Sequence, residues 1–173
     1  MPIDAFADEH ESDEILEKVL SNHVQKFILY PKDWHAPSRY GLTWDSIPFA
    51  SDEIEKIPER PGLYAFSLQC SCADAPPTSY IMYIGIVGIG TGMNRHLKTR
   101  YKEYLGKQKR PLVRHMINKW RDHLRFYFVP VNSQEHKLEE IETYLLDKLI
   151  PPCNEEDFSG HLKDAVKVVR SKT

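Results

Sequence analysis

The chain has no uninterrupted apolar run near the roughly 20 residues that a membrane-spanning helix needs, so we expect no membrane protein. Its N-terminus is acidic and has no apolar segment beside a basic one, so we also expect no secretion signal. Cysteine is scarce, and Cys70, Cys72 and Cys153 form no disulfide framework. The odd number of thiols predicts a cytoplasmic protein. The 173 residues, 41% of them hydrophobic, suit one domain with a buried core.

Two stretches of the sequence resemble a zinc site and a phosphate-binding loop, but only superficially. Cys70-Ser-Cys72 has no second pair of ligands, so a zinc site is disfavoured against small residues in a loop. The glycine-rich stretch 85–92 lacks the Gly-Lys-Ser/Thr ending of a phosphate-binding P-loop. It predicts a flexible turn into a helix, where the backbone could approach a phosphate closely.

Charge is unevenly distributed along a chain whose net charge is only -2. Between Arg95 and Arg125 eleven lysines and arginines face two acids, Glu103 and Asp122, a net charge of +9. Such a block predicts a polyanion partner, and the alternative is a set of solvated helix faces. The candidate DNA-binding residues are Arg95, Lys98, Lys102, Lys107, Lys109, Arg110 and Arg114.

The first third of the chain predicts an extension to the main domain. Apolar residues recur at helical spacing from Ser12 to Tyr30, and Pro31 ends the pattern. Residues 31–60 are irregular and rich in aromatics, which we expect to be buried anchors, with DNA contact as the alternative. A helical turn is expected over 52–56.

The remainder alternates strands and helices. Strands are predicted over 62–68, 80–85 and 124–129, the first two joined by the loop 69–79. Helices are predicted over 91–105, from Pro111 to Trp120, from a Ser133 cap to Leu149, and in the tail after Asn154. This order predicts an α/β (α+β) domain with a central, mainly antiparallel three-stranded sheet flanked by helices.

One carboxylate falls on the wrong face of the last long helix. At about 100° per residue, Glu142 lies within the apolar arc, between the directions of Leu149 and Leu146. A carboxylate on a buried face needs a cation, a metal or several donors. The alternatives are an arginine salt bridge or a wider arc. The arc consists of Leu138, Ile141, Leu145, Leu146 and Leu149.

Five features in order resemble the GIY-YIG nuclease family. They are Gly62-Leu-Tyr64, Tyr83-Ile-Gly85, Arg100, Glu142, and Asn154 shortly after Pro151. The separation of 12 between Glu142 and Asn154 is similar to that of the excinuclease branch. The resemblance covers 57–155, which leaves 1–56 as the N-terminal extension and 156–173 as a tail.

The resemblance implies a role for each of these residues. Glu142 would bind Mg²⁺ or Mn²⁺, Arg100 a phosphate oxygen, and Tyr64 and Tyr83 would line the side of the nucleophile. Asn154 would orient a tyrosine hydroxyl or close the site. His96 and Tyr104 are secondary candidates.

Two departures from the family pattern concern proton transfer. Many members have a lysine soon after the Tyr-Ile-Gly motif, where this chain has Ile86-Val87. Restriction-enzyme members often have a histidine one turn after the arginine, where this chain has Tyr104. The proton acceptor is therefore left open.

The expected function is a metal-dependent endonuclease of double-stranded DNA, of the repair and processing type or the restriction type. Cutting both strands would require a homodimer or sequential nicking. The alternative is a catalytically silent module that binds nucleic acid or protein. A third interpretation, based on charge alone, is a regulatory subunit whose acidic first sixty residues bind a basic partner.

Overall fold

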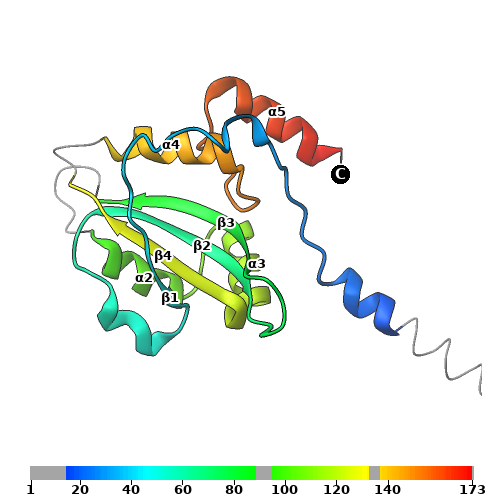
Figure 1. Ribbon diagram of the computed structural model, residues 1–173. Helices are drawn as coiled ribbons and strands as arrows, with labels where there is room; N and C mark the ends of the chain where they lie inside the picture. Colours follow the sequence, from blue (N-terminus) through cyan, green and yellow to red (C-terminus); the bar gives the residue numbers. More distant parts are fainter. Residues whose placement is uncertain (1–14, 89–94, 133–136, 173) are drawn as a thin grey trace, which may run out of the picture.

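The protein is a mixed α/β structure built on one antiparallel sheet (Figure 1). This computed structural model describes residues 15–88, 95–132 and 137–172. Neighbouring strands in the sheet follow the order β1-β4-β2-β3. The strands are β1 (Asp45–Pro48), β2 (Gly62–Cys70), β3 (Thr78–Val87) and β4 (Leu124–Pro130).

Helices cover both faces of the sheet (Figure 1). One face carries α2 (Leu97–Leu105) and α3 (Pro111–Trp120). The opposite face carries α4 (Leu138–Leu149) and α5 (Gly160–Ser171). Three short 3₁₀ helices are also present: η1 (Pro31–Asp33), η2 (Ser51–Lys56) and η3 (Arg121–His123).

The central strand β2 distributes its side chains between the two layers. Tyr64 and Phe66 pack in the cluster that contains α2 and α3. Leu63 and Ala65 pack in the clusters that contain α4. This alternation follows from the two-residue period of a strand. It places the tyrosine of the first motif on the same face as the basic helix α2.

The glycine of the second motif makes room for the tyrosine of the first. Tyr64 of β2 is paired with Gly85 of β3 across the sheet. A Cβ atom at Gly85 would overlap the hydroxyl of Tyr64 and lie 2.6 Å from its Cζ atom. The two motifs are therefore halves of one structural unit, because the ring of Tyr64 crosses β3 where a side chain is missing.

We expect Gly85→Ala to lower the free energy of unfolding by about 2–3 kcal/mol, because either the Tyr64 ring or the strand pair must shift. Urea denaturation measures this change. Gly160→Ala is the matched control, since a Cβ there meets no atom within 4 Å. Equal stability of the two variants would contradict the conclusion that the Tyr64 ring needs the space beside Gly85.

A β-bulge redirects the second tyrosine. The register of β2 and β3 shifts between Phe66 and Ser67, so that Met82 is the additional residue opposite them. Met82 and Tyr83 consequently join the same core cluster as Tyr64. Bulges commonly re-aim a side chain next to a functional site. Here the bulge brings the Tyr83 and Tyr64 ring centroids to 6.2 Å.

The expectation of three strands is wrong, because the described sheet has four. The additional strand β1 lies in the segment 31–60 that was predicted to be irregular, and it pairs with β4. It has four residues, ends at Pro48, and buries only Ile47, so it carries almost no alternation. Residues before 57 thus contribute a strand to the same sheet.

The predicted helix 12–30 is wrong in its second half. Residues 15–21 are helical and 22–30 are not, while 12–14 lie outside the described residues. Phe27 and Ile28 pack against the two core clusters instead of continuing a helical stripe. Pro31 begins η1 and does not end a helix.

The aromatics of this segment mainly pack on the domain, as expected. Tyr40 and Trp44 contact the core clusters beside α4, and Phe49 is buried. The Trp34 indole donates to the Lys148 carbonyl at 3.2 Å.

Several other predictions are confirmed. Pro111 occupies the first turn of α3, whose Val113, Met116 and Ile117 are buried. Strand β4, the 3₁₀ turn η2 and a helix in the tail form as expected.

The helix predicted over 91–105 starts at Leu97, with 91–94 outside the described residues. Lys137 is the N-cap of α4, and Ser133 also lies outside the described part.

None of the helices in the described ranges is both long enough and apolar enough to span a lipid bilayer.

Candidate active site

Two tyrosines and an arginine form a connected polar cluster on the α2 face of the sheet. The hydroxyls of Tyr64 and Tyr104 are 3.0 Å apart. Arg100 donates from Nε to the Tyr64 hydroxyl at 2.9 Å and from Nη2 to the Tyr104 hydroxyl at 3.1 Å. Both tyrosine side chains are almost completely buried. The guanidinium is thus fixed by a strand and by its own helix.

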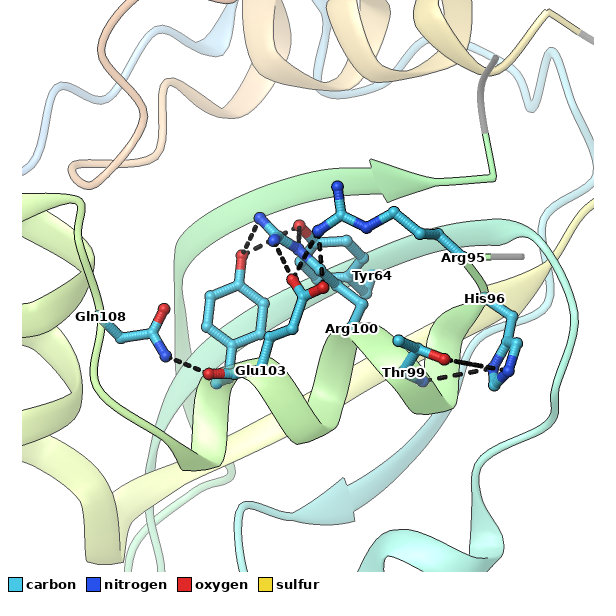
Figure 2. A network of polar contacts seen from close by, with 8 residues as sticks. Tyr64, Arg95, His96, Thr99, Arg100, Glu103 and Gln108 are labelled. Carbon is cyan, nitrogen blue, oxygen red and sulfur yellow. Dashed lines mark hydrogen bonds and ion pairs between the residues drawn. The ribbon is translucent and has the colours of Figure 1, made fainter. Parts of the chain in front are cut away.

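Helix α2 presents these groups because of its spacing and its cap. Arg100 and Tyr104 are four residues apart, so they lie one above the other on the helix. His96 is the N-cap residue, and its Nδ1 accepts a hydrogen bond from the Thr99 amide at 3.2 Å. The structure therefore gives His96 a capping position, with its ring bonded to Thr99 (Figure 2).

Glu103 joins Arg100 to a second arginine. Its carboxylate accepts from Arg100 Nη1 at 2.5 Å and from Arg95 Nη2 at 2.6 and 2.8 Å. Figure 2 shows the side chains of Arg95 and Arg100 meeting at this carboxylate. Three of the five guanidinium N–H groups of Arg100 are then engaged with Tyr64, Tyr104 and Glu103, and two remain for another acceptor.

Tyr83 has an arginine partner of its own. Arg110, in the turn before α3, donates from Nη1 to the Tyr83 hydroxyl at 2.6 Å. Burial raises the pKa of Tyr83, and the nearby Tyr64 adds to that effect, while Arg110 acts in the opposite direction. Burial likewise raises the pKa of Tyr104 well above its ordinary value. Both hydroxyls therefore stay protonated at neutral pH and can donate hydrogen bonds.

Two cavities of opposite character meet at Arg110. A basic cavity of about 470 Å³ is lined by Arg95, Arg100, Lys107, Lys109 and Arg110 together with Glu103, Tyr104 and Gln108. A smaller cavity of about 220 Å³ contains Tyr83, Arg110 and the segment 153–157, which includes three acids. One tyrosine–arginine pair faces each cavity, so a bound molecule could contact cationic and acidic groups together.

Glu142 is half-buried on α4, and its charge interacts with that of Asp157 in the smaller, acidic cavity. Burial raises the pKa of Glu142 to about 7, and Asp157 and Glu139 contribute in the same direction, against Arg110. No other described residue gives this carboxylate a hydrogen bond or an ion pair. The arginine salt bridge that was the alternative for Glu142 is therefore not formed in the described structure.

The environment of Glu142 fits a hard divalent cation. A half-buried carboxylate that lacks compensating charge gains from a bound cation, and the carboxylate oxygens of Glu142 and Asp157 suit Mg²⁺ or Mn²⁺. No cluster of three or more His, Cys, Asp or Glu in metal-binding geometry occurs in the described part of the chain. Glu142 with waters would therefore form most of the coordination shell.

Asn154 bonds to the backbone of β3 and not to a tyrosine hydroxyl. Its Oδ1 accepts from the Ile84 amide at 2.9 Å and its Nδ2 donates to the Ile84 carbonyl at 2.8 Å. Ile84 lies between Tyr83 and Gly85, so Asn154 secures the Tyr-Ile-Gly motif from the outer edge of the sheet. Arg170 of α5 donates to the Asn154 and Pro151 carbonyls at 2.5 and 2.9 Å.

The candidate DNA-binding residues lie in three different settings. Arg95, Lys107, Lys109 and Arg110 line the basic cavity. Lys98 instead bonds to Glu55 at 2.8 Å and lies 3.7 Å from Glu59. The remaining two, Lys102 and Arg114, are exposed on α2 and α3.

Two members of the site, Glu103 and Asp157, and the pairing of Arg110 with Tyr83 were not assigned from sequence. Glu103 was counted only as an acid within a basic block, although its spacing of three from Arg100 allows an ion pair. The partnership of Arg110 with Tyr83 depends on a turn whose path no local pattern specifies. The acidic run 155–157 was visible, but the position of Asp157 near Glu142 was not.

The free energy of unfolding of the metal-free protein is expected to depend on pH through the protonation of Glu142. The pKa of Glu142 is about 7 in the folded protein against 4.5 as its ordinary value. The folded state thus retains a proton that the unfolded state loses, and its stability falls as pH rises through this window. The loss should be about 1–2 kcal/mol after allowance for the partial exposure of the side chain. Urea denaturation in EDTA from pH 5 to 8 measures it, with Glu142→Gln as reference. If the stability of the wild type and of Glu142→Gln changed equally with pH, the raised pKa of Glu142 would be wrong.

Comparison with known proteins gives no relative: no family model matches the chain, and neither a curated protein nor a solved structure matches it.

Proposed function

We propose that this protein is a metal-dependent nuclease of the GIY-YIG type that hydrolyses phosphodiester bonds of double-stranded DNA. The observation that carries the proposal is the junction at Arg110 between a basic and an acidic cavity. The pair Arg100–Tyr104 lines one side of that junction and the pair Arg110–Tyr83 the other. The Glu142 carboxylate, which has no partner among the described residues, lies within electrostatic reach of it. Phosphodiester hydrolysis requires such groups together: cations for the phosphate, a proton acceptor, and a carboxylate for a metal.

Arg100 is the proposed phosphate ligand. Its N–H groups that are not bonded to the tyrosines can donate to a non-bridging phosphate oxygen while the bonds to Tyr64 and Tyr104 remain. Because Tyr64 and Tyr104 hold the guanidinium, little side-chain freedom is lost when the phosphate binds. A divalent cation held by Glu142 would polarise a phosphate oxygen and stabilise the leaving oxygen.

Tyr64 is the proposed proton acceptor. Its oxygen accepts from Arg100 Nε and lies 3.0 Å from the Tyr104 hydroxyl, so two donors are available to stabilise a negative charge there. The attacking water forms a bond to phosphorus, and its proton passes to the Tyr64 oxygen while the hydroxyl proton of Tyr64 passes to solvent. The bond from phosphorus to the leaving oxygen breaks, and that oxygen takes a proton from solvent. Tyr83 stays protonated and donates a hydrogen bond to the water or to a phosphate oxygen.

The proposed site makes one cut. A double-strand break then requires a second copy of the chain or two successive nicks. Both a repair or processing role and a restriction role are compatible with this chemistry.

One specific observation favours the second candidate, a silent module that binds nucleic acid. Burial raises the pKa values of Tyr83 and Tyr104, and Glu103 neutralises part of the charge of Arg95 and Arg100. A site in this state binds an anion but lacks an ionised base. Metal binding distinguishes the two candidates, because a silent module has no need of a cation.

The test combines Mn²⁺ titration calorimetry with duplex cleavage on the same preparation. The nuclease proposal predicts Mn²⁺ binding that Glu142→Gln removes and cleavage that EDTA abolishes. Duplex binding with neither Mn²⁺ binding nor cleavage would establish the silent module instead.

A further inference from the structure

The basic cavity contains one anionic group, and that group lies between two arginines. Glu103 provides both carboxylate oxygens to Arg95 and one of them also to Arg100. Burial acts to raise the pKa of Glu103, but the bonds from Arg95 and Arg100 outweigh it and hold that pKa below its usual value. The carboxylate is therefore ionised at neutral pH, and it makes the contacts that a phosphate would make with a pair of guanidinium groups.

The remainder of the cavity is arranged independently of this carboxylate. Gln108 donates from Nε2 to the backbone carbonyls of Glu103 and Gly106, at 2.5 and 3.1 Å. These bonds tie the turn after α2 to the last turn of the helix. Lys107 and Lys109 in that turn also line the cavity. Loss of the Glu103 charge thus leaves the positions of these lysines unchanged.

We propose that the Glu103 carboxylate holds the place of a nucleic-acid backbone phosphate, and that a bound strand displaces it from Arg95 and Arg100. The proposal rests on the proposed function, and it adds a subsite for a phosphate next to the one that is cleaved. Arg100 would keep its bonds to Tyr64 and Tyr104 during the exchange, so the tyrosine cluster stays assembled.

This arrangement selects for a strand over a single phosphate ion. Displacing Glu103 removes three charge-assisted hydrogen bonds, and one phosphate only replaces them. A strand brings further phosphates to Lys107, Lys109 and Arg110, and these contacts supply the net gain. Glu103 is accordingly a specificity-determining residue, and its removal raises affinity.

The experiment measures the binding of a fluorescein-labelled DNA duplex of about two helical turns by anisotropy in EDTA, where cleavage is absent. We expect Glu103→Gln to bind about five- to tenfold more tightly than the wild type at low salt. The slope of log K against log salt should steepen by about one, since roughly one more cation is available to phosphates. Glu59→Gln is the matched control, an acid exposed beside Lys98, and should change affinity less than about twofold.

A double-mutant cycle separates displacement from a general change in net charge. If Glu103 acts by occupying Arg95, the gain from Glu103→Gln must shrink in an Arg95→Gln background. Equal gains in both backgrounds would overturn the proposal, as would unchanged or weaker binding by Glu103→Gln. Circular dichroism verifies that each variant is folded.

The binding result for Glu103→Gln and the cleavage result for the proposed function can be told apart. Tighter and non-additive binding without any cleavage supports the subsite and contradicts the nuclease. Cleavage with no effect of Glu103→Gln supports the nuclease and contradicts the subsite.

Discussion

Plasmid cleavage in Mg²⁺ is expected to fall by about 10³-fold or more when Glu142 is replaced by glutamine. The amide keeps the shape of the side chain but removes the charge that holds a cation. The structure provides no substitute on α4, where Glu139 and Glu140 are exposed. Because wild-type Glu142 lacks a described partner and has a raised pKa, the variant should be at least as stable as the wild type at neutral pH. Lost activity would then be a loss of chemistry and not of folding.

Glu140→Gln is the matched control for this experiment. Glu140 lies on the same helix and forms an exposed ion pair with Lys137, at 3.3 Å. Its replacement should leave cleavage within about twofold of the wild type, as expected for an exposed pair. Full activity of Glu142→Gln, with retained dependence on Mg²⁺, would place the metal elsewhere.

The second large effect is expected for Arg100→Lys, which should reduce cleavage by about 10²-fold. A lysine keeps the positive charge but cannot bond to Tyr64, Tyr104 and a phosphate in one plane. The loss should appear mainly in kcat, because Arg95, Lys107 and Lys109 still attract the strand. Single-turnover cleavage at saturating DNA measures it directly.

Arg114→Lys provides the comparison for Arg100. Arg114 is exposed on α3 and does not line either cavity of the site. We expect kcat to be unchanged and binding to weaken little. If both variants lost activity equally, the loss would not depend on where the guanidinium lies, and the geometric role of Arg100 would be wrong.

The sequence predicted best those elements whose side chains make strong local patterns. Strand β4 is rich in aromatics and alternates between buried and partly exposed residues over most of its length, and α3 begins at a proline that suits a first helical turn. The hairpin of the two motif strands was predicted from two short apolar runs. The pairing of Tyr64 with Gly85 was not predicted, and the structure supplies its reason in the collision that a Cβ would cause.

Tertiary contacts explain the errors in the N-terminal segment. Phe27 fits a helical stripe by its spacing, but it lies in a non-helical segment and packs against Tyr80 with ring centroids 5.2 Å apart. Strand β1 forms because β4 offers a free edge, and a four-residue strand ending in proline shows no pattern of its own. Neither outcome could be obtained from periodicity.

The site was only partly accessible from sequence for the same reason. Arg100 and Glu142 were identified from motif order and from a misplaced carboxylate on a helix. The bond of Arg110 to Tyr83 joins a turn to a strand, so it depends on the assembled fold. Asn154 was identified by spacing, yet its amide bonds to the Ile84 backbone, which no spacing indicates.

The most direct test of the nuclease proposal is the conversion of supercoiled plasmid by the purified wild-type protein in Mg²⁺, beside Glu142→Gln, Glu140→Gln and an EDTA control. The proposal predicts nicked or linear plasmid with the wild type and Glu140→Gln, and intact plasmid in the other two reactions. Cleavage that persists in Glu142→Gln, or intact plasmid with every protein although the wild type binds the DNA, would contradict it.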